Sequence, residues 1–223
     1  MNICAVIPAH NEAKTIGYLV EEARKKGLDA LVIDDGSSDQ TARIAKEKGA
    51  TVIRNDKTIG KGASLRKGFN FVIDKNYDGI LTLDGDGQHD PEDILQFMEK
   101  IKESDAKIVV GNRMLKARNM PFTRWLTNKI MSSFISSICR QNIPDTQCGF
   151  RYINKEALKS LELSTSNFEI ETEILIEAGK KGYKIYSVPI KTIYQDHKSR
   201  INPFLDTMRF FGFIFRKRWT SKD

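Results

Sequence analysis

The sequence predicts an α/β fold in which helices cover both faces of a mixed, mostly parallel central sheet. Short apolar runs rich in β-branched residues alternate along the chain with longer segments of helical period, as in βαβ units. The length of 223 residues and the 40% hydrophobic composition suit one domain with a single core. No apolar run is long enough to cross about 30 Å of hydrocarbon, so we expect no transmembrane helix.

Each element is expected where one of these two patterns is clear. Strands are expected at Ile3–Ile7, Ala30–Ile33, Thr51–Ile53, Ile80–Leu83, Lys107–Val110, Lys184–Val188 and Lys191–Tyr194. Helices are expected at about Thr15–Lys26, Gln40–Lys48, Lys61–Asp74, Pro91–Glu103, Trp125–Arg140, Lys155–Leu161 and Phe168–Gly179. Asp39 can cap the second helix, while Asp90 and Pro91 give the fourth an N-cap and a first-turn proline.

The cysteines and the N-terminus indicate a reducing compartment. Cys4, Cys139 and Cys148 form no even framework and show no ligand spacing, so we expect free, packed thiols. The first residues lack the basic start and small-residue cleavage site of a signal peptide. We therefore expect a protein of the cytosol.

Polar residues follow three of the expected strands at the point where each strand ends. These loops are Pro8-Ala9-His10-Asn11-Glu12, Asp34-Asp35-Gly36-Ser37 and Asp84-Gly85-Asp86-Gly87-Gln88. In a parallel sheet, ligands bind beyond the carboxyl ends of the strands. Side chains from all three loops are therefore expected to converge on one pocket.

The third loop has the chemistry of a metal site. Asp84 and Asp86 repel each other unless a cation lies between them, and hard oxygen ligands suit Mg²⁺ or Mn²⁺. A polar turn before the Pro91 helix is the simpler alternative. A calcium-binding EF-hand is excluded because His89 and Leu95 stand at the loop positions that need Gly and Glu.

Two other phosphate-handling classes fit less well. A phosphatase of the haloacid dehalogenase type also begins with two such aspartates, but Gln88 stands where Thr or Val is needed, and the motif lies mid-chain. The segment Gly60-Lys61-Gly62-Ala63 lacks the third glycine and the spacing of a dinucleotide or Walker loop.

Five motifs together resemble an ordered series found in family 2 glycosyltransferases. They are the three strand-end loops, the second extended through Thr41, together with Gly60-Lys61-Gly62-Ala63 plus Gly68, and Gly111-Asn112-Arg113. The match spans roughly residues 3–200 and is most similar to the dolichol-phosphate mannosyltransferase and polyprenyl-phosphate glycosyltransferase branch. The resemblance implies the Rossmann-like GT-A fold.

The resemblance also implies roles for individual residues. The nucleotide sugar would be bound by Pro8, Asn11, Glu12, Asp34, Asp35, Lys61, Asp84 and Asp86. Asp84, Asp86 and Gln88 would hold Mg²⁺ or Mn²⁺. The acceptor phosphate would be bound by Arg113, Arg124, Ser199 and Arg200, the last two in a segment that closes over the donor. Asp86, Arg113 and Arg124 would be the catalytic residues.

Two further segments resemble this branch. Residues 145–151 match its loop after the aspartate pair, and residues 168–171 match its acidic helix, although Glu169 and Glu171 can also be read as solvated helix charges.

The implied reaction is inverting transfer of mannose or glucose from GDP-mannose or UDP-glucose to a polyprenyl or dolichyl phosphate. A phosphate acceptor is already ionised near neutral pH, so it needs no base. The alternative is a hydroxyl acceptor, which needs a carboxylate base, with Asp145 or Glu169 as the candidate. Nucleic-acid binding is opposed by the acidic residues at the strand ends.

The last residues predict contact with a membrane surface. Residues 203–223 form a basic, aromatic segment whose five Lys and Arg against two Asp supply +3 of the net charge of +7. We expect an amphipathic helix there, after a catalytic domain at 1–202, lying on the cytoplasmic face of a membrane or packed on its own domain. The 130–138 helix, with Met131, Phe134 and Ile135, is expected to add apolar surface.

Overall fold

The computed structural model describes residues 1–115 and 120–193. Ser199, Arg200 and the amphipathic helix expected at 203–223 lie outside the described residues.

The described chain contains seven strands and eight helical segments in an alternating order. The strands are β1 Ile3–Ala9, β2 Asp29–Asp34, β3 Thr51–Arg54, β4 Gly79–Thr82, β5 Ile108–Asn112, β6 Arg151–Asn154 and β7 Ile185–Pro189. The helices are α1 Ile16–Lys25, α2 Thr41–Glu47, α3 Lys61–Ile73, the 3₁₀ helix η1 Pro91–Asp93, α4 Ile94–Ser104, α5 Phe122–Cys139, α6 Lys155–Ser160 and α7 Ile170–Lys180.

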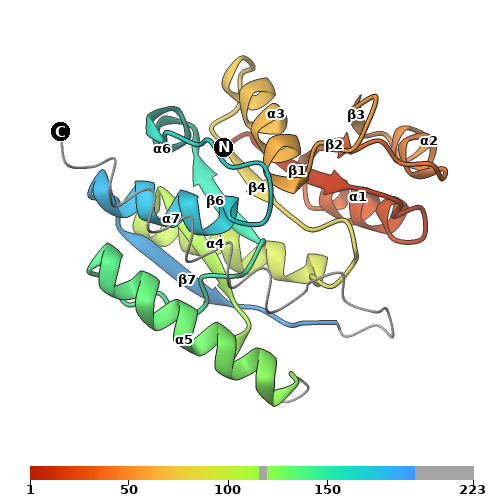
Figure 1. The fold of residues 1–223 in the computed structure, drawn as a ribbon. Helices are drawn as coiled ribbons and strands as arrows, with labels where there is room; N and C mark the ends of the chain where they lie inside the picture. The colour runs from red at the N-terminus through yellow and green to blue at the C-terminus, as the bar shows by residue number, and fades with distance from the viewer. Residues whose placement is uncertain (116–119, 194–223) are drawn as a thin grey trace.

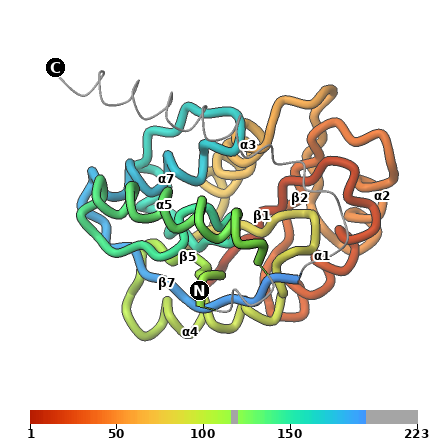
Figure 2. The backbone as a smooth tube through the Cα atoms, turned by 60° about the horizontal axis from the view of Figure 1, so that its bottom comes forward, coloured from red at the N-terminus to blue at the C-terminus, as the bar shows by residue number. Residues whose placement is uncertain are grey.

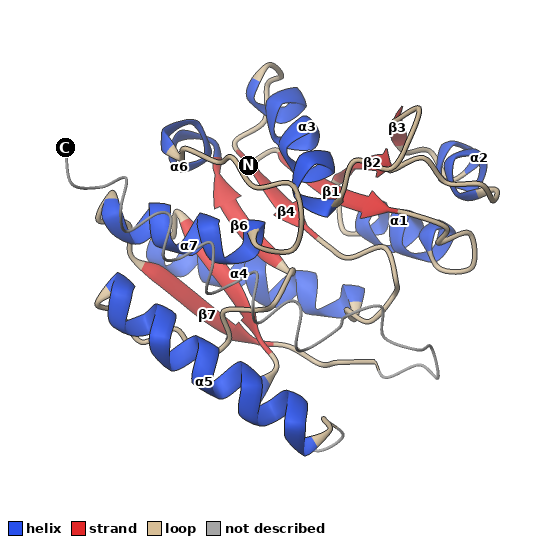
Figure 3. Cartoon of the chain, viewed as in Figure 1, coloured by secondary structure: helices blue, strands red, loops and turns tan. Residues whose placement is uncertain are grey.

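All seven strands form one sheet in the order β3-β2-β1-β4-β6-β5-β7 (Figures 1 and 3). Every neighbouring pair is parallel except those made by β6, which runs antiparallel to both β4 and β5. The predicted α/β class with a mixed, mostly parallel sheet is therefore confirmed.

Two strand expectations differ from the structure. β6 was not expected, because four residues directly before a helix carry little local pattern and its pairing with β4 and β5 is long-range. The strand expected at Lys191–Tyr194 is wrong for its described part, where Thr192 forms only an isolated bridge with His89. β7 ends at Pro189 opposite Asn112, the last residue of β5, so no partner strand continues beside the following residues.

The helices form a layer on each side of the sheet. Figure 1 shows α3, α6 and α7 on one face and α1 and α4 on the other. Helix α5 packs against α7, and Figure 2 shows the two helices side by side from a second direction. Within residues 1–115 and 120–193, no helix is long and apolar enough to span a bilayer.

The expectations about the Asp90 cap and the thiols hold, whereas the N-cap of α2 is Gln40 and Asp39 lies one residue before it. The Asp90 carboxylate accepts a hydrogen bond from the Glu92 N–H at the start of η1, and Asp39 accepts one from the Thr41 N–H at the start of α2. The three cysteines are free and buried.

Candidate active site at the carboxyl ends of the strands

The turn after β4 packs closely against the end of β1. A Cβ added at Gly85 would lie 2.9 Å from the Pro8 carbonyl oxygen, so only glycine fits this approach. The Thr15 hydroxyl donates a 2.6 Å hydrogen bond to the Gly85 carbonyl. The close contact with the backbone of β1 fixes the direction in which Asp84 and Asp86 leave the sheet.

Lys61, the first residue of α3, lies between two carboxylates from distant parts of the chain. Its Nζ is 2.5 Å from Asp84 Oδ1 and 2.7 Å from Glu171 Oε1. Burial alone would lower the pKa of Lys61, but Asp84 and Glu171 hold it above its usual range. Burial alone would raise the pKa of Asp84, but the charge of Lys61 holds it well below its usual range. We call these three side chains the Lys61 ion group.

Glu171 is a member of this site that the sequence did not identify. Its side chain is only 7% exposed, so its interpretation as a solvated helix charge is wrong. Of the described residues, none makes a hydrogen bond to Glu171 Oε2, although that atom is buried. The signal available in the sequence was the position of Glu171 in the first turn of a largely apolar helix.

The residues after β4 fit a divalent cation. Burial and the nearby charge of Asp84 both raise the pKa of Asp86, so the two carboxylates repel and a cation would relieve the repulsion. Across 1–115 and 120–193, no three His, Cys, Asp or Glu side chains form a metal-binding group. Mg²⁺ commonly takes only one or two protein carboxylates and completes its shell with water and substrate phosphates. Asp84 and Asp86 meet that requirement, and the side chain of Gln88 as a third ligand stays a prediction.

Arg113 lies at the same edge of the sheet, directly after β5. Its Nε and Nη2 donate hydrogen bonds of 2.7 and 2.9 Å to the two carboxylate oxygens of Asp145. Burial would lower the pKa of Arg113, but Asp145 raises it well above its usual range, and Asp84 adds to that effect. Arg113 is therefore a buried, permanently charged group that lies in the field of Asp84.

Asp35 holds the loop that carries Lys61. Its carboxylate accepts 2.9 Å hydrogen bonds from the backbone N–H groups of Ile59 and Gly60 and a 2.8 Å bond from the Asn55 side chain. Burial opposes ionisation, but these donors together hold the pKa of Asp35 below its usual value. The structure thus shows Asp35 binding the chain itself, and its contact with a nucleotide stays a prediction.

The remaining residues expected to bind the nucleotide are divided between the interior and the loops. Asp34 is fully buried, accepts a hydrogen bond from the Ser37 N–H and pairs with Arg54. Pro8 is buried within β1. Asn11 is partly buried, and its Oδ1 accepts a 2.8 Å bond from the Ser38 N–H. Glu12, also partly buried, begins the loop into α1.

Arg124, which is expected to bind the acceptor phosphate, lies on α5. It lies in the first turn of this helix and is half-buried. One turn later, Asn128 is buried, and none of the described residues receives a hydrogen bond from its Nδ2. The following turn contacts the 143–147 loop, where Ser132 Oγ accepts a 2.9 Å bond from the Thr146 N–H. Asn128 was missed in the sequence, although it stands four residues after Arg124 and hence on the same side of the helix.

Five large apolar side chains project from α5 at intervals of four residues. This α5 stripe, with exposed fractions from 38% to 70%, consists of Phe122, Leu126, Ile130, Phe134 and Ile138. The apolar surface expected on this helix is right for Phe134 but wrong for Ile135, which is fully buried, and for Met131, which packs partly buried against the core. The true surface begins two turns earlier and includes the turn that carries Arg124.

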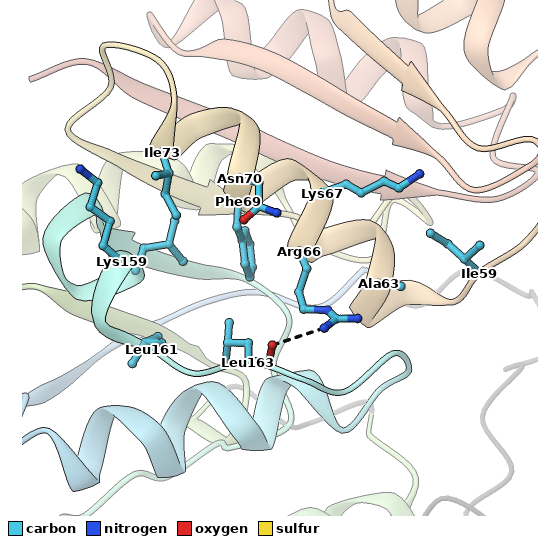
Figure 4. A pocket seen from close by; sticks show the side chains of 11 residues that line it. Ile59, Ala63, Arg66, Lys67, Phe69, Asn70, Ile73, Lys159, Leu161 and Leu163 are labelled. Atoms are coloured by element: carbon cyan, nitrogen blue, oxygen red, sulfur yellow. Dashed lines mark hydrogen bonds between the residues drawn. The ribbon is translucent and has the colours of Figure 1, made fainter.

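A separate hollow of about 500 Å³ lies along α3 (Figure 4). It is lined mainly by apolar side chains of α3 and of the segment around Leu161 and Leu163, and Arg66 donates a hydrogen bond to the Leu163 carbonyl across it. None of Asp84, Asp86 and Arg113 lines this hollow, so the candidate site is the strand-end edge and not this groove.

Comparison with known proteins decides the family. The chain matches the family model described as glycosyl transferase family 2 over residues 4–162. The chain belongs to this family. It is 32% identical over 218 residues to the UDP-N-acetylglucosamine–dolichyl-phosphate N-acetylglucosaminyltransferase of Methanococcus voltae, covering 87% of each chain. It is 32% identical over 202 residues to the dolichol-phosphate mannosyltransferase of Pyrococcus furiosus, covering 85% of this chain and 56% of that protein.

Solved structures agree with the fold of this glycosyltransferase. The mannosyl-3-phosphoglycerate synthase of Rubrobacter xylanophilus superposes with a TM-score of 0.74 at 18% identity, covering all of this chain and 76% of that one. The glucosyl-3-phosphoglycerate synthase of Mycobacterium tuberculosis, solved with Mn²⁺, UDP and phosphoglyceric acid, gives 0.70 at 18% identity, covering 93% and 73%. The GT-A fold implied by the sequence motifs is therefore confirmed.

The role of Asp35 predicts a pH-dependent stability. Asp35→Asn should lower the free energy of unfolding at pH 7 by roughly 1–3 kcal/mol, because a charged acceptor of backbone donors is lost. Since the folded pKa of Asp35 is depressed, its contribution is present above the unfolded pKa of about 3.9 and is lost as pH falls through the folded value. Urea unfolding from pH 7 to pH 3 should therefore show the difference between the two proteins shrinking below about pH 4.

The control for this measurement is Asp105→Asn, which removes an exposed carboxylate after α4. It should change the free energy of unfolding at pH 7 by no more than about 0.5 kcal/mol. An Asp35→Asn protein as stable as wild type at pH 7 would show that Asp35 does not hold the Lys61 loop.

Proposed function

We propose that the protein is an inverting glycosyltransferase that moves a hexose, mannose or glucose, from GDP-mannose or UDP-glucose to a polyprenyl or dolichyl phosphate. Family membership supports the reaction class. The named activities of the relatives from M. voltae and P. furiosus support the lipid phosphate acceptor. The observation that carries the proposal is the meeting of Asp84, Asp86, Lys61 and Arg113 at the carboxyl ends of the strands.

The donor side of the reaction needs positive charge around a diphosphate. Lys61 and Arg113 supply positive charge near Asp84. Asp84 and Asp86 are the residues that would hold Mg²⁺ or Mn²⁺, with Gln88 as a further ligand. When bound, the metal offsets negative charge on the leaving nucleoside diphosphate. The relatives in fold crystallised with UDP and Mn²⁺ or Mg²⁺ support a divalent cation for this chain.

The acceptor side argues for a phosphate rather than a hydroxyl nucleophile. Asp145, one candidate base for a hydroxyl acceptor, is fully buried and both of its oxygens bind Arg113. Burial would raise the pKa of Asp145, but Arg113 holds it below its usual range, which makes this carboxylate a weak proton acceptor. The hydroxyl-acceptor alternative would rest on Glu169 instead. An ionised phosphate attacks C1 of the sugar without any base.

Arg113 and Arg124 are proposed to position that phosphate. A guanidinium binds phosphate oxygens through paired N–H donors. Asp145 fixes two of the Arg113 donors, which orients the remaining Nη1. Asn128 offers an additional buried donor one turn after Arg124. Ser199 and Arg200 remain proposed members of the same group.

The α5 stripe is proposed to bring the enzyme to its lipid substrate. It places a row of exposed apolar side chains on the helix that carries Arg124. Such a helix can lie in the interface of a bilayer with its apolar side chains in contact with the acyl region. We propose that the enzyme acts peripherally on the cytoplasmic face of a membrane, with residues 203–223 as a second, basic contact.

The activity is tested with Mg²⁺ or Mn²⁺, a polyprenyl phosphate and a panel of radiolabelled nucleotide sugars. Wild type should form labelled lipid with one donor, and Asp86→Asn should lower kcat by at least about 100-fold, because transition-state charge loses its counterion. Asp105→Asn is the matched control and should retain wild-type rates. Absence of labelled lipid with every donor, or full activity in Asp86→Asn, would contradict the proposal.

Membrane contact is tested by vesicle flotation with mixed phosphatidylcholine and phosphatidylglycerol vesicles. Ile130→Ser should weaken binding roughly tenfold, because one large apolar side chain no longer leaves water. Its KM for the lipid phosphate should rise while its KM for the nucleotide sugar stays constant. Tyr18→Ser, on the exposed side of α1, is the control and should change neither quantity. Unchanged flotation of Ile130→Ser would show that α5 does not touch the bilayer.

A further inference from the structure

The Lys61 ion group places a protein cation on a carboxylate that is expected to hold a metal. Lys61 Nζ contacts Asp84 Oδ1 at 2.5 Å, closer than its 2.7 Å contact with Glu171. A metal ion that uses the same Asp84 oxygen cannot approach while the ammonium stays there, since the two cations compete for one site and repel each other. A metal ion bound through Asp84 Oδ1 would therefore displace Lys61 from that oxygen.

We propose that Lys61 is the counter-cation of Asp84 in the metal-free enzyme, and that Glu171 is the positioning residue that retains Lys61 when a metal takes its place. With a metal held by Asp84 and Asp86, Lys61 would stay paired with Glu171, and its ammonium would be free to contact the diphosphate of the donor. This inference rests on the proposed function, because it assigns a metal and a nucleoside diphosphate to the site.

The backbone of Glu171 is fixed by hydrogen bonds, and its carboxylate has room for a further contact with Lys61. Its backbone carbonyl accepts a hydrogen bond from Arg151 Nη1, and Arg151 also binds the carbonyls of Thr146 and Cys148. Within the described part of the chain, Glu171 Oε2 has no hydrogen-bond partner although it is buried. A lysine released from Asp84 can therefore gain a second contact on the same carboxylate.

The main chain on both sides of Lys61 is held in place. Asp35 binds the N–H groups of Ile59 and Gly60 on one side. On the other side, a Cβ added at Gly62 would lie 2.7 Å from the Asn167 carbonyl, so the helix start is pressed against the segment before α7. Lys61 Nζ also lies 5.6 Å from the centre of the Phe168 ring, an additional favourable position for a cation.

The inference makes a prediction about Mn²⁺ binding, measured by electron paramagnetic resonance on purified protein without sugar donor. Lys61→Met should bind Mn²⁺ alone more tightly, on the order of tenfold, because the competing charge is gone. The same variant should bind Mn²⁺ together with a nucleoside diphosphate more weakly than wild type, because the diphosphate loses a cation. If Lys61 had a purely structural role, Lys61→Met would bind Mn²⁺ more weakly than wild type both with and without nucleoside diphosphate.

The positioning role of Glu171 is tested by ranking the affinities of wild type and three variants for Mn²⁺ without nucleotide. Glu171→Gln should bind more weakly than wild type, since Lys61 is left with Asp84 as its only carboxylate. The double variant Lys61→Met/Glu171→Gln should bind more tightly than wild type and less tightly than Lys61→Met. A double variant weaker than wild type would show that Glu171 acts on the metal directly and would overturn its positioning role.

Controls separate charge from folding. Lys75→Met removes one positive charge beyond the far end of α3 and should leave Mn²⁺ binding unchanged. Lys61→Arg keeps the charge and should stay closer to wild type than Lys61→Met, which keeps the test decisive if the methionine variant is unstable. Unchanged Mn²⁺ affinity in Lys61→Met overturns this inference alone, whereas wild type that binds no Mn²⁺ even with nucleoside diphosphate overturns the metal site of the proposed function as well.

Discussion

The repulsion between Asp84 and Asp86 is the constraint on which the site depends. Both carboxylates leave β4 on one short turn, and burial together with Asp84 raises the pKa of Asp86. A nearby cation lowers the cost of holding two such charges together. Lys61 supplies a cation whose Nζ lies 2.5 Å from Asp84 Oδ1, and the charge of Arg113 also acts on Asp84. The mixed sheet, with β6 inserted between β4 and β5, brings these residues and Glu171 to one edge.

The two proposed substrates would meet different kinds of surface. On the donor side, the loops after β1 and β2 mostly bind one another, as Asp35 does with the backbone before α3. On the acceptor side, Arg113 is locked to Asp145, while Arg124 lies on a helix whose neighbouring side chains are apolar and exposed. A charged group of side chains next to an apolar helix surface would suit a water-soluble donor and a lipid acceptor in the same enzyme.

Much of this arrangement could be predicted from the sequence because it follows local rules. The alternation of apolar runs and helical segments predicts the sheet class, and parallel strands bring Asp35 and Asp84 to one edge. Glu171 and β6 were not predictable in that way. Glu171 becomes part of the site only because the first turn of α7 and the segment before it lie against the start of α3. β6 exists only through pairing with two distant strands. Asp34 is a different case: the structure shows it fully buried, bound to the Ser37 N–H and paired with Arg54, and its contact with a nucleotide stays a prediction.

The most direct test of the central claim, that Asp84 exchanges Lys61 for a metal ion, is a crystal structure of the enzyme with Mn²⁺ and a nucleoside diphosphate. The expected result is a metal bound by Asp84 and Asp86, with Lys61 Nζ beyond hydrogen-bond distance of Asp84 and still in contact with Glu171. A structure in which Lys61 is still paired with Asp84 and the metal lies away from Asp86 would contradict this claim.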